Sequence, residues 1–105
     1  MKEPILSTLA VEPYFKPCEE YLINEEKIIR FLICDGETDA SLVALMKIDQ
    51  HICVLYNKNA EKYNYPPNRT IGGKTIHGLF YIVGIDDNNH LISLTEEDIR
   101  KYRNI

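Results

Sequence analysis

Short apolar segments alternate with polar ones along the first third of the chain and predict two strands followed by a helix. Residues 5–11 and 18–23 are apolar-rich runs of strand length, separated by a proline-containing turn. Residues 25–33 place apolar side chains at i, i+1, i+4 and i+5, the spacing of an amphipathic helix. Asn24 suits the N-cap of this helix, and Gly36 can take the positive φ that ends it.

The middle of the chain predicts a β-hairpin. Residues 40–48 contain good helix formers, but their side chains also alternate with the period of a strand. Asp49-Gln50 follows as a tight turn, and residues 51–57 alternate again. Two alternating runs around a two-residue turn favour the hairpin, and a helix at 40–48 stays open as the alternative.

The last third predicts a buried strand, a returning strand and a C-terminal helix. Residues 76–86 are apolar on both alternating faces, which is typical of a central strand covered on both sides. A turn of Asp and Asn residues leads to the returning strand at 90–94. Thr95 is the N-cap of the last helix, which we expect to cover one face of the central strand through Ile99 and Tyr102.

These elements predict one α+β domain, residues 1–105, with two helices packed on a largely antiparallel sheet. Residues 58–75 show no periodicity and contain Pro66-Pro67 and Gly72-Gly73. We therefore expect a loop there. It is longer than most connections inside compact domains, and such loops are often functional.

Composition predicts a soluble protein of the cytoplasm. The chain has 105 residues and a net charge of −4, which argues against a broad surface for duplex nucleic acid or acidic membranes. Three cysteines without a Cys-x-x-Cys pair favour a reducing compartment. The sequence contains no apolar run of the ~18 residues that a membrane-spanning helix needs.

Positive charge and aromatic side chains gather in the expected loop. Residues 57–75 contain four cations and one acid, so this segment carries +3 and the rest of the chain −7. Cations, aromatic faces and amides are the groups that bind a nucleotide or a short single strand. The alternative is an exposed loop whose tyrosines cover the sheet. The candidate ligand-binding residues are Asn57, Lys58, Tyr63, Tyr65, Asn68, Arg69 and Lys74.

Arg69 is the residue of this set with the most specific expected role. Its planar guanidinium matches phosphate or carboxylate geometry, and Pro66-Pro67 stiffens the approach to it. We predict that Arg69 anchors either the long loop or an anionic ligand.

Motifs for other chemistry are weak. Gly72-Gly73-Lys74-Thr75 resembles the end of a phosphate-binding loop, but Asn68 replaces the first glycine of that motif and a β-rich segment follows. A glycine turn that feeds a strand is the simpler interpretation. His51, Cys53 and His77 lack the spacing of a zinc site. We therefore assign no catalytic residue, no metal ligand and no cofactor.

Several short motifs, in order, resemble one protein family. They are Val11-Glu12-Pro13 with Pro17, Asn57, Pro67-Asn68-Arg69, the run 77–84 and the ending 92–99. Together, over residues 9–102, they resemble the family called domain of unknown function 3846. The resemblance implies an origin in bacteriophages, plasmids and their bacterial hosts, and it implies no catalytic residues. Asn68-Arg69 matches the Asn-Arg pair of that family, whereas Lys58 stands where the family usually has Glu.

These observations support three hypotheses about function. The first is a non-enzymatic binding protein of a phage or mobile element, which would counter a host defence by capping a host protein or sequestering a nucleotide signal. The second is a small hydrolase or transferase that binds a phosphate-bearing substrate through residues 58–75. The third is a protein–protein interaction or regulatory module without a small-molecule ligand.

Self-association is a further expectation. Residues 51–56 carry no charged side chain when histidine is neutral, so they would be a poorly protected strand at the edge of a sheet. We therefore predict a homo-oligomer, most simply a dimer.

Overall fold

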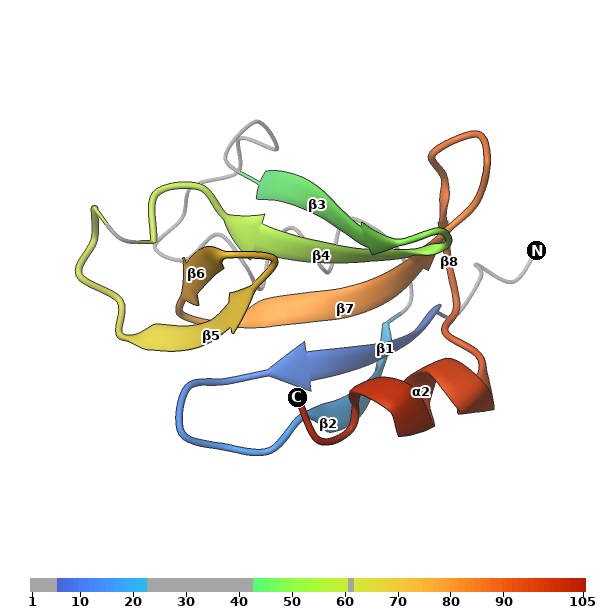
Figure 1. The fold of residues 1–105 in the computed structure, drawn as a ribbon, viewed down its shortest axis with the longest axis horizontal. Coiled ribbons are helices and arrows are strands. Elements are labelled where there is room, and N and C mark those ends of the chain that lie inside the picture. Colours follow the sequence, from blue (N-terminus) through green and yellow to red (C-terminus); the bar gives the residue numbers. More distant parts are fainter. Residues whose placement is uncertain (1–5, 23–42, 61) are drawn as a thin grey trace.

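The computed structural model describes residues 6–22, 43–60 and 62–105, which form antiparallel β-structure and a short helix (Figure 1). The main sheet has the strand order β2-β1-β7-β4-β3, and β8 pairs with the end of β7. A separate hairpin consists of β5 and β6. The elements are β1 (Leu6–Val11), β2 (Cys18–Leu22), β3 (Val43–Asp49), β4 (Ile52–Asn57), β5 (Pro67–Ile71), β6 (Lys74–His77), β7 (Phe80–Ile85), β8 (Leu91–Ile92) and α2 (Glu96–Tyr102).

The predicted α+β class with two helices is wrong, because the fold is mainly antiparallel β and the described residues contain only the seven-residue α2 as a helix. The segment expected to be a loop at 58–75 contains β5 and the first half of β6. Gly72 and Gly73 take φ values of 58° and 81° and close this hairpin in two residues, as a tight hairpin turn of the primed type requires. The helix expected at 25–33 lies outside the described residues.

The hairpin predicted in the middle of the chain is confirmed for the described residues, which begin at Val43. β3 and β4 pair in antiparallel register from Val43 opposite Asn57 to Lys47 opposite Cys53, and a bulge precedes the turn. Because Asp49 pairs with Ile52, the two turn residues are Gln50-His51 and not the predicted Asp49-Gln50. Residues 43–48 are therefore strand and not helix.

The position of β4 removes the reason for which we expected self-association. β4 pairs with β3 on one side and with β7 on the other, so it lies inside the sheet. Its uncharged run is covered by main-chain pairing and is not an open edge. An oligomer stays a prediction without this support.

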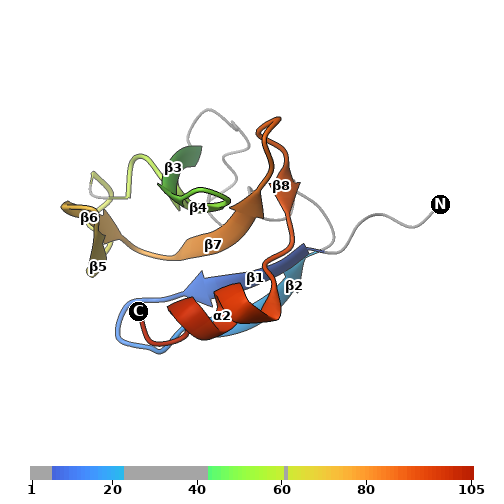
Figure 2. The ribbon, with the colours of Figure 1, turned by 45° about the vertical axis from the view of Figure 1, so that its right-hand side comes forward.

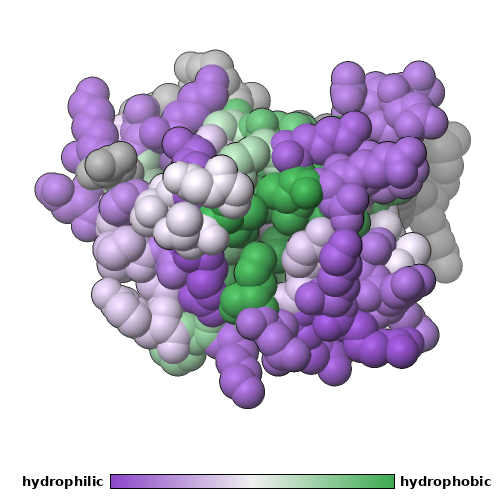
Figure 3. All heavy atoms as spheres, in the orientation of Figure 1, coloured by the Kyte–Doolittle hydropathy of each residue, from purple (hydrophilic) through white to green (hydrophobic). Residues whose placement is uncertain are grey.

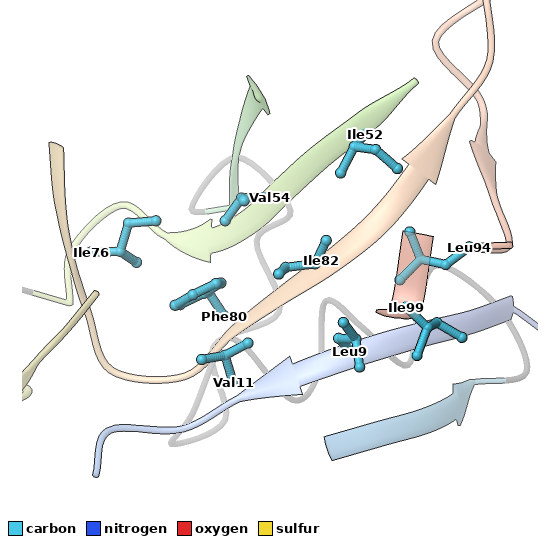
Figure 4. Close-up of a cluster of buried hydrophobic side chains, with 9 residues drawn as sticks. All are labelled: Leu9, Val11, Ile52, Val54, Ile76, Phe80, Ile82, Leu94 and Ile99. Carbon is cyan, nitrogen blue, oxygen red and sulfur yellow. The ribbon is translucent and has the colours of Figure 1, made fainter. Parts of the chain in front are cut away.

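β7 is the central strand, as predicted, since it pairs with β1 and β4 and all its residues are buried. One face contributes to a cluster that we call the Phe80 cluster (Figure 4): Leu9, Val11, Ile52, Val54, Ile76, Phe80, Ile82, Leu94 and Ile99. The other face contributes to the Tyr81 cluster: Leu6, Ala10, Cys53, Leu55, Tyr81, Val83 and Ile85. Burial raises the pKa of the Cys53 thiol to about 11, so this cysteine stays neutral.

Helix α2 covers the Phe80 cluster beside β1 and β2 (Figure 2). Its start is a capping box. The Asp98 N–H donates to the Thr95 hydroxyl at 3.1 Å, and the Thr95 N–H donates to the Asp98 carboxylate at 3.0 Å. Ile99 is buried and Tyr102 packs against the same cluster, which confirms the inward face predicted for this helix. In the described ranges, no helix is long and apolar enough to cross a membrane.

Candidate functional site

The segment that links β4 to β5 is held in shape by hydrogen bonds of its own main chain. The buried Asn57 accepts from the Asn59 N–H through its side chain at 2.8 Å and from the Ala60 N–H through its carbonyl at 3.2 Å. The Tyr63 N–H donates to the Asn59 carbonyl, and the Tyr65 N–H to the Ala60 carbonyl, both at 3.0 Å. Asn57 therefore shapes this connection from inside the protein and does not face solvent.

The two tyrosines of this segment have different surroundings. Tyr65 packs on Gly78, where an added Cβ would come within 2.9 Å of the Tyr65 ring. Gly78 also has a φ of 72°, so both its conformation and its lack of a side chain are needed there. Tyr63 remains 47% exposed, with its ring centroid 6.0 Å from that of Tyr65. Of these two tyrosines, Tyr63 is the one whose ring is open to a ligand.

The lysines at this end of the sheet are exposed and lack acidic partners. Lys58, Lys62 and Lys74 form no ion pair with any carboxylate that the structure describes. The Lys74 ammonium lies 5.6 Å from the centre of the Tyr56 ring, which joins the β5–β6 hairpin to the end of β4. We call the side chains of Tyr56, Lys58, Lys62, Tyr63 and Lys74 the lysine–tyrosine end. Polar side chains crowd this margin of the molecule in Figure 3, on its left.

Tyr56 and Lys62 are the members of this end that the candidate residues did not include. The sequence pattern indicates Tyr56 only as a strand residue of the central hairpin, and Lys62 only as one of the four cations of residues 57–75. The place of Tyr56 as the last alternating residue before Asn57 is a usable signal, because such a side chain lies beside the loop that follows.

The Asn68 side chain forms hydrogen bonds inside the protein. Its side-chain amide donates to the carbonyls of Val11 and Gly78, both at 2.8 Å. These bonds fasten β5 to the end of β1 and to the turn before β7. Its carbonyl oxygen accepts from Arg69 at 2.6 Å, so both ends of this amide form hydrogen bonds inside the protein.

Arg69 has a protein acceptor for each nitrogen of its guanidinium. Nε donates to the main-chain oxygen of Ile105 at 3.0 Å, Nη1 to Asn68, and Nη2 to the carbonyl of Phe15 at 2.6 Å. We call this network the Asn68–Arg69 latch. It joins β5 to the turn between β1 and β2 and to Ile105, which lies after the end of α2. Three of the five N–H donors of the guanidinium are thus used inside the protein, which makes Arg69 an anchor of the fold, and its role toward a ligand stays a prediction.

Negative charge gathers at the other end of the sheet. The β3–β4 turn, the β7–β8 turn and the start of α2 lie on the right of Figure 1, whereas the segment between β4 and β5 lies on the left. The N–H groups of His90 and Asn88 donate to Asp86 and lower the pKa of its carboxyl group. The acids at this end are Asp49, Asp86, Asp87, Glu96, Glu97 and Asp98, of which Asp49 is paired with the Lys101 ammonium at 2.7 Å.

The chain belongs to the DUF3846 family. Residues 31–105 match the family model described as Domain of unknown function (DUF3846). This range includes the Asn68-Arg69 pair and the ending 92–99, whereas Val11-Glu12-Pro13 lies outside it. No curated protein and no solved structure matches the chain significantly.

Proposed function

We propose that this protein is a non-enzymatic binding protein and that its lysine–tyrosine end binds a nucleotide through the phosphate groups and the base. The observation that carries the proposal is the separation of charge. Three exposed lysines that form no ion pair with a described carboxylate lie at the same end of the sheet as an exposed tyrosine, and acids gather at the opposite end. Such a field attracts phosphate toward the lysine–tyrosine end and repels it from the end where the six acids lie.

The aromatic rings of this end can bind the base of a nucleotide, which the charges of the lysines do not bind. A base that stacks on an exposed ring gains ~1–3 kcal/mol, whatever its identity. Tyr63 is 47% exposed, and Tyr56 is partly buried beneath the Lys74 ammonium. Phosphates near the lysines and a base on Tyr63 would therefore be bound at the same time.

The biological setting of this proposal comes from the family resemblance. A phage or mobile element that makes a protein of this kind would sequester a nucleotide signal of its host and so counter a defence that depends on the signal. The chemistry requires only binding, because the lysines and tyrosines of this end attract and stack on the ligand without transferring a group.

We expect Lys58→Gln/Lys62→Gln to weaken binding of a fluorescent single-stranded hexanucleotide by ~10-fold or more at low salt, because two phosphate contacts are lost. Fluorescence anisotropy measures the affinity, and a competing mononucleotide measures how much one base and one phosphate contribute. The matched control is Lys47→Gln/Arg100→Gln, which removes the same charge from exposed positions on β3 and α2.

The control decides between a site and a bulk effect of charge. The proposal predicts that the control variant keeps at least about half of the affinity of the unmodified protein, since those cations lie away from the ligand. Equal losses in both double variants, or no measurable binding by the unmodified protein, would contradict it.

A further inference from the structure

Two aromatic side chains stand in solvent at the turn between β1 and β2. Tyr14 is 83% exposed and Phe15 is 64% exposed. The turn that presents them is held in place, because the Phe15 carbonyl accepts from Arg69 at 2.6 Å and its N–H donates to the Glu12 carbonyl at 3.3 Å. Tyr14 has a φ of 70°, an uncommon conformation for a bulky residue. Large rings held in water on a fixed turn are typical anchors of protein interfaces.

A hollow of about 360 Å³ opens beside Phe15. Ala10 lies opposite Cys18 across the β1–β2 pair, so two short side chains form its floor. Glu20 lies two residues after Cys18 on β2 and therefore points to the same face, and Glu12, which follows the end of β1, lines the hollow as well. The described residues that line the hollow are Ala10, Glu12, Phe15, Lys16, Cys18 and Glu20.

The charge of the hollow is negative. Two carboxylates line it against one ammonium, and Lys16 forms no ion pair with a described carboxylate. The field of the acids reaches the neighbouring strand, where Tyr81 lies opposite Ala10. Burial, and after it the charges of Glu20 and Glu12, raise the pKa of Tyr81 to about 12. A cationic group is therefore the occupant that this hollow suits.

We infer that this side of the β1–β2 hairpin docks a protein partner that inserts an arginine side chain into the hollow and covers Tyr14 and Phe15 with apolar surface. The guanidinium would bind Glu12 and Glu20 and lie against the Phe15 ring, the two contacts that arginine makes best. The β1–β2 turn lies on the same side of Figure 1 as the lysine–tyrosine end, but the two surfaces share no side chain. The inference therefore goes beyond the proposed nucleotide binding.

The test uses the full chain and two dipeptides, acetyl-leucyl-arginine amide and its citrulline counterpart, which has the same shape without the charge. In ¹H–¹⁵N NMR titrations, the arginine probe is expected to shift the amide signals of residues 10–20 and to bind at least ~10-fold more tightly than the citrulline probe. Glu12→Gln/Glu20→Gln should remove this difference. Lys16→Gln should strengthen binding by ~2–5-fold, because a competing cation is lost.

Glu96→Gln/Glu97→Gln is the matched control, since it removes two negative charges at the start of α2, and it should bind the arginine probe like the unmodified protein. Equal binding of both dipeptides to the unmodified protein overturns the inference even if a variant fails to fold. Shifts confined to other residues overturn it as well. An oligonucleotide that shifts residues 10–20 would assign this surface to nucleic acid instead of protein.

Discussion

Phe80→Ala is expected to lower the free energy of unfolding by ~3–5 kcal/mol. Phe80 is fully buried in the central strand, opposite Val11 of β1 and Tyr56 of β4. Removal of its ring leaves a cavity in the middle of the Phe80 cluster, and three strands meet there, which limits how far the neighbours can move to fill it. This loss is a large part of the ~5–15 kcal/mol that stabilises a whole domain. Urea unfolding followed by circular dichroism measures it.

Tyr63→Ala is the matched aromatic control for this measurement. Its ring is about half exposed and touches Tyr65 at the surface, so the loss should stay within ~1 kcal/mol. Lys58→Ala should change stability by no more than ~0.5 kcal/mol. If Phe80→Ala unfolds at the same urea concentration as Tyr63→Ala, β7 is not the centre of the core.

Arg69→Ala is expected to lower the free energy of unfolding by ~2–4 kcal/mol, because hydrogen bonds from a charged group contribute more than neutral ones. The change removes three bonds at once, those to Ile105, Asn68 and Phe15. It also frees the chain end and the β1–β2 turn from β5. Arg69→Lys keeps the charge but cannot reach acceptors in three directions, so it should recover less than half of the loss.

Arg103→Ala is the control for the latch. Arg103 forms an exposed ion pair with Glu19 at 3.4 Å, the kind of contact that contributes ~0–1 kcal/mol. Chemical denaturation of the three arginine variants side by side separates the two roles. A loss in Arg69→Ala no larger than that in Arg103→Ala would show that the latch does not hold the fold together.

The strands that pair with near neighbours were predictable from local patterns. Asp49-Gln50 between two alternating runs led to the β3–β4 hairpin, and the apolar run around Ile82 led to the central strand. The same rules were available for residues 67–77, where two glycines separate two short strands. Pro66-Pro67 was interpreted as loop, but proline is tolerated as the first residue of a strand. The missed hairpin adds two strands to a fold whose described residues contain only the short helix α2, so the class is mainly β.

The candidate site also has features that the sequence predicted and features that it did not. Charge is a property of composition, so the excess of lysine near Tyr63 was visible in the sequence. The roles of Asn68 and Arg69 were not visible, because their acceptors lie up to 57 residues away along the chain. No local rule distinguishes an arginine that binds a phosphate from one that binds carbonyl oxygens of its own chain. Only the tertiary arrangement decides between these two uses.

The most direct test of the lysine–tyrosine end is an NMR map of the unmodified protein with a single-stranded hexanucleotide. We expect the amide signals of residues 56–65 and 72–76 to shift and saturate, whereas those of residues 86–90 and 95–98 at the acidic end stay in place. The shifts should shrink as salt rises, with a slope of about −2 for log affinity against log salt if three lysines contact phosphate. Shifts at the acidic end, or an affinity that does not depend on salt, would contradict the proposed site.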